Sequence, residues 1–147
     1  MNIRLINDDD FPVIFDIYAQ SKLDELRFET RHFELLPLEY DEVRLAELKE
    51  SDIYIYEDED ENVVGYGALC GLEIRALFVL PSARGRGVGR NLLEFLLRKA
   101  VGGVILYVAK TNTPAKQLYQ HYGFKVISEF ETQYNGMPVF ANKMVRN

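Results

Sequence analysis

Hydrophobic and polar residues alternate along the chain with two different periods, and each period predicts one kind of element. Short runs rich in β-branched and aromatic residues predict strands or hairpins at residues 2–6, 52–71, 72–80, 104–109 and 124–145. Apolar residues three or four positions apart predict helices at residues 11–18, 39–49, 87–100 and 113–123. The predicted class is α/β, and the predicted order of elements is β-α-α-β-β-β-α-β-α-β-β.

Local residue types mark where several of these elements begin and end. Asp8 to Asp10 would cap the first helix and place negative charge in its first turn. Pro81 stops the strand before it, and Gly123 ends the last predicted helix. Asn135-Gly136 predicts a tight turn between the last two strands. Residues 20–50 are amphipathic, highly charged and interrupted by a proline, so this stretch is the hardest to assign.

Length and composition limit the architecture. A chain of 147 residues with 48% apolar content can bury one core, so residues 1–147 are predicted to form a single domain. No apolar run approaches the roughly 18 residues that a membrane span needs. The N-terminal sequence lacks the basic and then apolar layout of a signal peptide. We therefore expect a cytoplasmic protein that does not associate with a membrane.

Charge and the scarcity of metal-ligating residues exclude other classes of function. A formal net charge of -6 argues against a nucleic-acid binder, which needs a broad basic face. Cys70 is the single cysteine, so no internal disulfide can form, and its place in an apolar run predicts an inert, buried thiol. His32 and His121 stand far apart in the sequence, so we expect no metal site.

One glycine-arginine segment contrasts with the acidic chain around it. Its alternating glycines leave the backbone open to close approach, and the helix that follows directs free N–H groups and its positive dipole end into the same space. Its arginines add charged groups that suit phosphate oxygens. The segment therefore predicts a site for a small pyrophosphate ligand, although a solvated surface turn would have the same composition. Its residues are Arg84, Gly85, Arg86, Gly87, Val88, Gly89 and Arg90.

Two common phosphate-binding motifs do not fit this segment. A P-loop requires Lys and then Ser or Thr after its last glycine, whereas Arg90 and Asn91 follow Gly89. The dinucleotide-binding motif G-x-G-x-x-G has a different spacing and opens its fold, whereas these glycines are evenly spaced and follow several predicted strands. A nicotinamide-nucleotide oxidoreductase is therefore a less favoured alternative.

The segment and a second motif together resemble the GNAT N-acetyltransferase family. The family's acyl-CoA-binding motif is Arg or Gln, two residues, Gly, one residue, and Gly or Ala, and residues 84–89 match it after a strand that ends in LFVLP. The resemblance covers residues 62–130 by motif, and it implies a mixed, mostly antiparallel central sheet flanked by helices. The second motif follows at the expected distance and consists of Asn112, Ala115, Leu118-Tyr119 and Gly123-Phe124.

The resemblance implies acetyl-CoA as the co-substrate. The glycine-arginine segment would hold its pyrophosphate. The pantetheine arm would lie like an extra strand along Leu77, Phe78 and Val79, beside a bulge that frees their N–H and C=O groups. The N–H of Val79 is the predicted donor to the oxyanion of the tetrahedral intermediate. Asn112 would cap the helix that begins there, and in the family this position also contacts the coenzyme arm.

Transfer to an amine requires a base and an acid. An alkylamine with a pKa near ~10 is mostly ammonium at neutral pH, so a base must remove a proton directly or through water. Glu73 stands at the family's distance before the glycine loop and is the predicted base, although it could instead pair with Arg75 on the same strand face. Tyr119 matches the family tyrosine that protonates the leaving thiolate, and its alternative role is packing in the core.

The resemblance also implies that the acceptor enters between residues 22–40 and 132–139. A small-molecule amine, a peptide N-terminus and a protein lysine all remain open, as do a monomer and a homodimer. The predicted function is direct N-acetyl transfer, and a non-catalytic acyl-CoA sensor is the main alternative. Acidic and aromatic side chains in these segments favour a cationic amine; they are Asp24, Glu25, Phe28, Glu29, Phe33, Glu34 and Tyr134.

Overall fold

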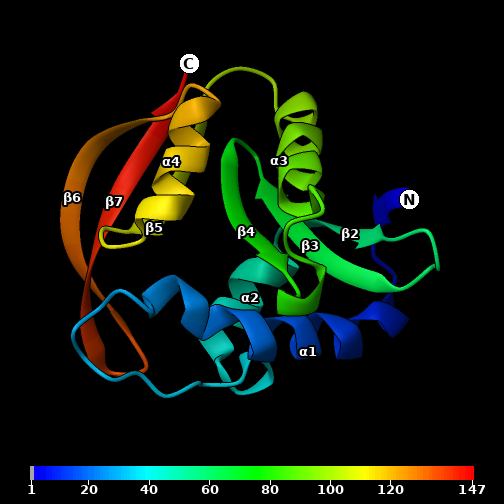
Figure 1. The fold of residues 1–147 in the computed structure, drawn as a ribbon, viewed down its shortest axis with the longest axis horizontal. Coiled ribbons are helices and arrows are strands. Elements are labelled where there is room, and N and C mark those ends of the chain that lie inside the picture. Colours follow the sequence, from blue (N-terminus) through cyan, green and yellow to red (C-terminus); the bar gives the residue numbers. More distant parts are fainter. Residues whose placement is uncertain (1) are drawn as a thin grey trace.

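Seven strands form one mixed sheet in the computed structural model, which describes residues 2–147 (Figure 1). The order across the sheet is β1-β2-β3-β4-β5-β7-β6, and neighbouring strands are antiparallel except for β4 and β5. The strands are β1 (Asn2–Leu5), β2 (Asp52–Glu57), β3 (Val63–Cys70), β4 (Glu73–Val79), β5 (Val104–Ala109), β6 (Lys125–Tyr134) and β7 (Met137–Arg146). The helices are α1 (Phe11–Ser21), α2 (Glu42–Lys49), α3 (Val88–Lys99) and α4 (Thr113–His121), with 3-10 turns η1 (Asp8–Asp10), η2 (Lys22–Leu26), η3 (Leu38–Tyr40) and η4 (Pro81–Ala83).

The predicted order of strands and α-helices is confirmed, and the differences lie at the ends of elements. Asn7, rather than Asp8, caps the first turn: its side chain accepts the N–H of Asp9 at 3.1 Å. The predicted helix at 39–49 is divided into η3 and α2. The division arises because Asp41 caps α2 and accepts the N–H of Arg44 at 3.2 Å.

Different helices cover the two faces of the sheet. α1 and α2 pack on one face through Ile14, Ile17 and Leu48, against Ala76 and Phe78 of β4. α3 and α4 pack on the opposite face (Figure 1). No helix within residues 2–147 is both long and apolar enough to cross a membrane. The core of the second face includes Leu93, Leu96, Leu106, Phe124 and Met144.

β4 and β5 pair at their beginnings and then separate. Within residues 2–147, their parallel ladder holds the first two residues of β4 alone. Arg75, the next residue, forms a bulge, because Ala68 on β3 pairs with Ala76 while Leu69 pairs with Ile74. The bulge and the separated strands implied by the family resemblance are therefore present.

This separation leaves alternate backbone groups of β4 open. Leu80 N–H donates to Val64 C=O at 2.8 Å, and because bonded pairs alternate in an antiparallel ladder, Phe78 also bonds to β3. The N–H and C=O groups of Leu77 and Val79 point the other way, toward β5. No strand within residues 2–147 pairs with them there. This free stretch of β4 backbone positions the site.

Candidate active site

Three adjoining cavities lie where β4 and β5 separate. The loop cavity, of about 590 Å³, is bounded by η4, the glycine-arginine segment and α4. The inner cavity, of about 190 Å³, lies between α1, α2 and β4. The hairpin cavity, of about 210 Å³, lies between β5, α4 and the β6–β7 turn. Glu25, Leu77 and Tyr119 line all three, so the cavities meet at these side chains.

The glycine-arginine segment forms one wall of the loop cavity. Gly87 stands at the N-terminus of α3 in the left-handed conformation, with φ of 80°, where a side chain would be strained. The first N–H that the helix itself satisfies is that of Asn91, which donates to Gly87 C=O, so the preceding amides are available to an anion. Most of the predicted coenzyme-binding residues line this cavity: Leu77, Phe78, Val79, Arg84, Gly85, Gly87, Val88, Gly89, Arg90 and Asn112.

The three arginines of the segment have different surroundings. Arg90 lines the loop cavity. Arg84 also lines it, but its guanidinium forms an ion pair with Asp24 of η2, across the cavity from the loop. Arg86 does not line it; its side chain donates to Ser82 C=O at 3.4 Å and faces a separate surface pocket. The segment therefore directs two of its three arginines toward the loop cavity.

Two predicted coenzyme contacts differ from expectation in detail. Asn112 stands at the N-cap position of α4 but makes no capping bond with its side chain, which lines the loop and hairpin cavities instead. Phe78 packs its ring into the core against Tyr18 and Tyr66. Since its backbone bonds to β3, the open backbone groups are those of Leu77 and the N–H of Val79, whereas the Val79 C=O accepts a hydrogen bond from the Arg84 guanidinium at 3.4 Å.

Tyr119 lies on α4 where the three cavities meet, and its ring packs edge-on against Phe124 with 5.8 Å between centroids. Burial raises the pKa of its hydroxyl well above the ordinary value, and the negative charge of Glu25 adds to the effect. The phenol therefore stays protonated at neutral pH and can donate a proton or a hydrogen bond.

Glu73 begins β4 and stands outside the walls of the three cavities. Its carboxylate lies 3.5 Å from the guanidinium of Arg75, which also contacts the Glu50 carboxylate at 3.0 Å. Arg75 itself lines the inner cavity. The ion pair weighed in the sequence is therefore present, and Glu73 reaches the cavity wall through Arg75.

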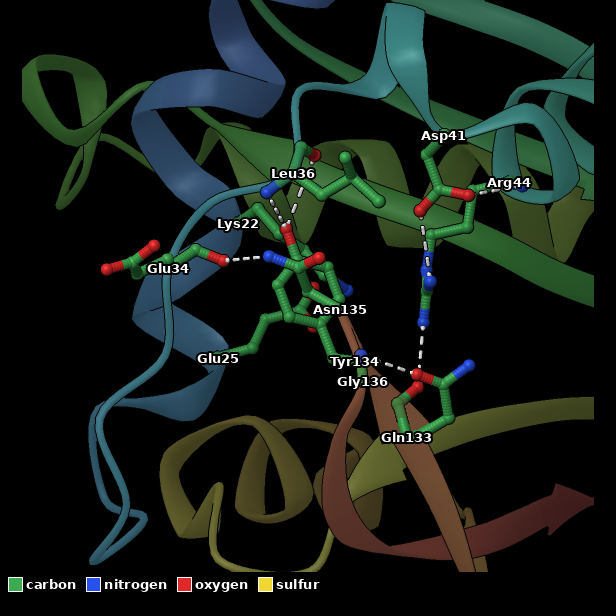
Figure 2. A network of polar contacts seen from close by, with 10 residues as sticks. All are labelled: Lys22, Glu25, Glu34, Leu36, Asp41, Arg44, Gln133, Tyr134, Asn135 and Gly136. Atoms are coloured by element: carbon green, nitrogen blue, oxygen red, sulfur yellow. Dashed lines mark hydrogen bonds and ion pairs between the residues drawn. The ribbon is translucent and has the colours of Figure 1, made fainter.

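The tip of the β6–β7 hairpin closes one side of the site, as Figure 2 shows. Tyr134 OH accepts the N–H of Leu36 at 2.8 Å and donates to Leu36 C=O at 3.3 Å. The side-chain amide of Asn135 donates to Glu34 C=O at 3.1 Å. These bonds join the segment between α1 and α2 to the hairpin, two parts of the chain about a hundred residues apart.

Most of the acidic residues expected to attract a cationic amine form ion pairs or hydrogen bonds with other side chains of the protein. Asp24 pairs with Arg84, and Glu29 accepts a hydrogen bond from the Thr111 hydroxyl. Glu25 pairs with Lys22 at 2.9 Å but also lines all three cavities, which makes it the acid best placed to meet a ligand.

The sequence analysis missed the cations of the acceptor side. Lys22 and Arg44 line both the inner and the hairpin cavity, and each lies about 5 Å from the ring centroid of Tyr134 (5.2 and 5.0 Å). Arg44 also contacts Asp41 at 3.1 Å and donates to Gln133 C=O at 3.4 Å (Figure 2). No local sequence motif marks this cluster, because its members come from three distant segments.

His121 and Cys70 lie outside the walls of the three cavities. Within residues 2–147, no three His, Cys, Asp or Glu side chains gather as metal ligands. His121 is exposed and its ring packs edge-on against Tyr122. Cys70 is half-buried at the end of β3, with its sulfur 3.9 Å from Glu50 C=O, rather than in the core as expected. Cys70 is more accessible than the apolar run around it predicted, because it lies at the end of β3.

Similar sequences and similar folds occur among known proteins. The chain is similar to peptidyl-lysine N-acetyltransferase YjaB of Salmonella typhimurium, with 34% identity over 91 residues, 62% of this chain and 62% of that protein. The fold is similar to the solution structure of apo-form YjaB from Escherichia coli, with a TM-score of 0.72 and 26% identity over 98% of this chain and 95% of that chain. It is also similar to a GNAT superfamily phosphinothricin acetyltransferase from Sinorhizobium meliloti in complex with AcCoA, with a TM-score of 0.73 and 20% identity over 99% and 86% of the two chains.

The family model of the acetyltransferase (GNAT) domain matches residues 49–126, more than half of the chain. This range includes β4, the glycine-arginine segment and α4, the elements that build the loop cavity. The alignments span 62% and 61% of the YjaB sequences from Salmonella typhimurium and Escherichia coli, less than two thirds of each. On the family match, the chain belongs to the GNAT acetyltransferase family.

Proposed function

We propose that the protein transfers the acetyl group of acetyl-CoA to a primary amine by direct attack through a tetrahedral intermediate. The observation that carries the proposal is the junction of the three cavities. A large cavity with an anion-binding wall meets two smaller ones at Glu25, Leu77 and Tyr119, beside open backbone N–H groups of β4. A thioester and an amine that enter from opposite sides would meet there.

The loop cavity suits the coenzyme. Its pyrophosphate would accept hydrogen bonds from the free amides at the start of α3 and from Arg90. The pantetheine arm would then run along the open backbone of Val79 and Leu77 and past Asn112. Acetyl-CoA supplies an activated acyl group, and the residues of the chain bind and orient it.

The oxyanion donor would be a β4 amide. Val79 N–H was predicted for this role and faces the gap, but Val79 lines the loop cavity alone. Leu77 N–H faces the same gap at the junction of all three cavities. We therefore favour Leu77 as the donor to the oxyanion and Val79 as a contact for the arm.

Two carboxylates would act on the amine, one by binding its ammonium group and the other by removing a proton. Glu25 at the junction would bind the incoming ammonium group. Glu73 remains the proposed base, and because it stands behind Arg75 it would act through water. The nitrogen would then attack the acyl carbon, the C–S bond would break, and Tyr119 would give its proton to the thiolate. The acylated nitrogen would lose its second proton, which restores the phenol of Tyr119.

A turnover assay tests this proposal. Purified protein is mixed with acetyl-CoA and a panel of primary amines, free thiol is measured, and acetylated products are identified by mass. We expect amine-dependent thiol release with one acetylated product per thiol. A protein that binds acetyl-CoA but releases no thiol with any amine would instead be an acyl-CoA sensor, and one that binds NADH and not CoA would be the oxidoreductase alternative.

A further inference from the structure

The hydroxyl of Tyr18 is a buried polar group with no hydrogen-bond partner among the described residues. Tyr18 is 3% exposed, and its ring packs edge-on against Phe78 with 5.4 Å between centroids. A buried hydroxyl without a partner is destabilising because it has lost its hydrogen bonds to water, so folded proteins rarely contain one. Tyr18 lines the inner cavity, where a ligand could supply the missing acceptor.

Three cations line the inner cavity, and two of them, Lys22 and Arg44, also line the hairpin cavity, whereas Arg75 pairs with Glu50 and Glu73. Lys22 lies 5.9 Å from the centroid of the Tyr18 ring, and Arg44 lines the same cavity as Tyr18. An ammonium group has three donors, and the side chain of Lys22 uses one, toward Glu25. A guanidinium group has five donors, and Arg44 directs two of them to Asp41 and Gln133. Donors therefore remain on both cations for a ligand.

The charges in the cavity walls are mixed, and both of these cations are paired with acids, Lys22 with Glu25 at 2.9 Å and Arg44 with Asp41 at 3.1 Å. Lys22 and Arg44 lie against the Tyr134 ring at the hairpin tip (Figure 2). Glu25 lines the inner cavity and also the loop cavity. The inner cavity, at about 190 Å³, is below the ordinary size range of sites for drug-sized ligands. A small molecule with an amine at one end and an anion nearby would match both charges.

We infer that Tyr18, Lys22 and Arg44 form a subsite for a carboxylate, and that the acceptor is an amino acid or a close analogue of one. The inference rests on the proposed acetyl transfer and names its substrate class. The carboxylate oxygens accept hydrogen bonds from the three side chains, which leaves the amine near Glu25 and Leu77. One proton leaves the ammonium group before attack, the free amine forms the N–C bond as the thioester C–S bond breaks, and the nitrogen then loses a second proton while the thiolate takes up one, so that one proton is released overall.

The experiment compares matched acceptors. The proteinogenic amino acids are assayed beside their primary amides and their decarboxylated amines, which lack the carboxylate. Aminophosphonic acids test a different anion. Diamines and lysine peptides represent the competing classes of acceptor. We expect kcat/KM for the best acid to exceed that of its amide at least tenfold, since the amide leaves the charged donors poorly matched. A phosphonate that outperforms its carboxylate would overturn the choice of a carboxylate.

Substitutions test whether the side chains of the subsite cause the preference for an acid over its amide. Tyr18→Phe removes the hydroxyl alone, and Arg44→Gln removes one charge; each should raise KM for the acid about tenfold and leave KM for acetyl-CoA unchanged. Tyr40→Phe is the matched control, because Tyr40 is 74% exposed and lines none of the three cavities. An acid preference that survives both substitutions would overturn the assignment of these residues.

The remaining outcomes separate this inference from the proposed function. If diamines or lysine peptides are acetylated and amino acids are not, the carboxylate subsite is wrong while acetyl transfer stands. If no amine of any class is acetylated by protein that binds acetyl-CoA, acetyl transfer is wrong, and the inference falls with it.

Discussion

Burial and charge suit Tyr119 and Glu25 to different roles at the junction of the cavities. Burial raises the pKa of Tyr119, and the charge of Glu25 raises it further, so the hydroxyl stays neutral through the pH range in which an enzyme works. Glu25 keeps contact with Lys22 while it faces the cavities. One residue can therefore donate a proton while the other binds a cation.

The proposed acid role of Tyr119 predicts a specific kinetic change. Tyr119→Phe should lower kcat about 10²-fold, the lower end for general acid catalysis, with little change in KM for acetyl-CoA. Because the pKa of Tyr119 is raised, the wild-type kcat should show no loss of this acid below pH ~10, the ordinary tyrosine value. Steady-state rates from pH 6 to 10 check both points. An unchanged kcat in the variant would assign Tyr119 to packing.

Glu73 and Glu25 should differ in which constant they affect. Glu73→Gln should lower kcat about 10²-fold at pH 7, and the deficit should shrink as pH approaches the amine pKa near ~10, where the free amine needs no base. Glu25→Gln should mainly raise KM for the acceptor. Glu50→Gln is the control for Glu73, since both carboxylates pair with Arg75 and the comparison shows whether a loss comes from the disturbed arginine rather than from a missing base. A kcat loss in Glu25→Gln alone would transfer the base role to Glu25.

The short elements around β4 and α3 determine how open the site is. The bulge at Arg75 turns β4 away from β5, which exposes backbone that a continuous sheet would use. η2 crosses near the coenzyme loop, and its Asp24 holds Arg84. In the ligand-free protein, a coenzyme anion must therefore compete with Asp24 for Arg84.

This competition predicts tighter coenzyme binding when the acid is removed. Asp24→Asn should lower the Kd for acetyl-CoA about two- to fivefold, the range expected for one exposed ion pair. Titration calorimetry measures the change, and the gain should shrink at high salt. Asp16→Asn, an exposed acid on α1, is the control. A weaker affinity in Asp24→Asn would mean that Asp24 orients Arg84 for the coenzyme.

The junction of β1 and α1 depends on one carboxylate. Asp10 accepts hydrogen bonds from Arg4 at 2.9 Å and from Asn7 N–H at 2.8 Å, and these contacts, Arg4 first, hold its pKa below the ordinary value. Asp10→Asn should lower the free energy of unfolding by about 1–2 kcal/mol at pH 7. Denaturant unfolding measures this loss, with Asp8→Asn as the exposed control.

The sign of the pH dependence follows from the lowered pKa of Asp10. The stabilisation is fully present above the unfolded value near ~3.9 and is lost as pH falls through the lower folded value. The difference between wild type and Asp10→Asn should therefore disappear in that acid range. A constant difference from pH 7 to pH 2 would contradict the role of the charge.

The order of elements was predictable for the whole molecule because each one has a local signal. Alternating apolar residues mark the strands, and the glycines at 85, 87 and 89 mark the loop before α3. The bulge at Arg75 has no such signal, since it depends on the register between β3 and β4. The coenzyme side also has local sequence signals, and most of the motif residues that the sequence marks lie together in the loop cavity, with Arg86 as an exception.

The acceptor side could not be predicted in the same way. Tyr18, Lys22, Arg44 and Tyr134 come together only when the β6–β7 hairpin docks on the segment between α1 and α2. Their spacing along the chain carries no periodic pattern. A single domain over residues 1–147, a cytoplasmic location and a monomeric or homodimeric state remain predictions of the sequence.

The most direct test of the account is thermal unfolding in the presence of acetyl-CoA, CoA or NADH. A ligand at a hundred times its Kd adds about 2.7 kcal/mol to the stability of the folded state, which for a domain of this size raises Tm by about 5–10 °C. We predict this rise with acetyl-CoA and with CoA, and no rise with NADH. No change with either form of CoA would contradict the assignment of the loop cavity to the coenzyme, and with it the proposed acetyl transfer.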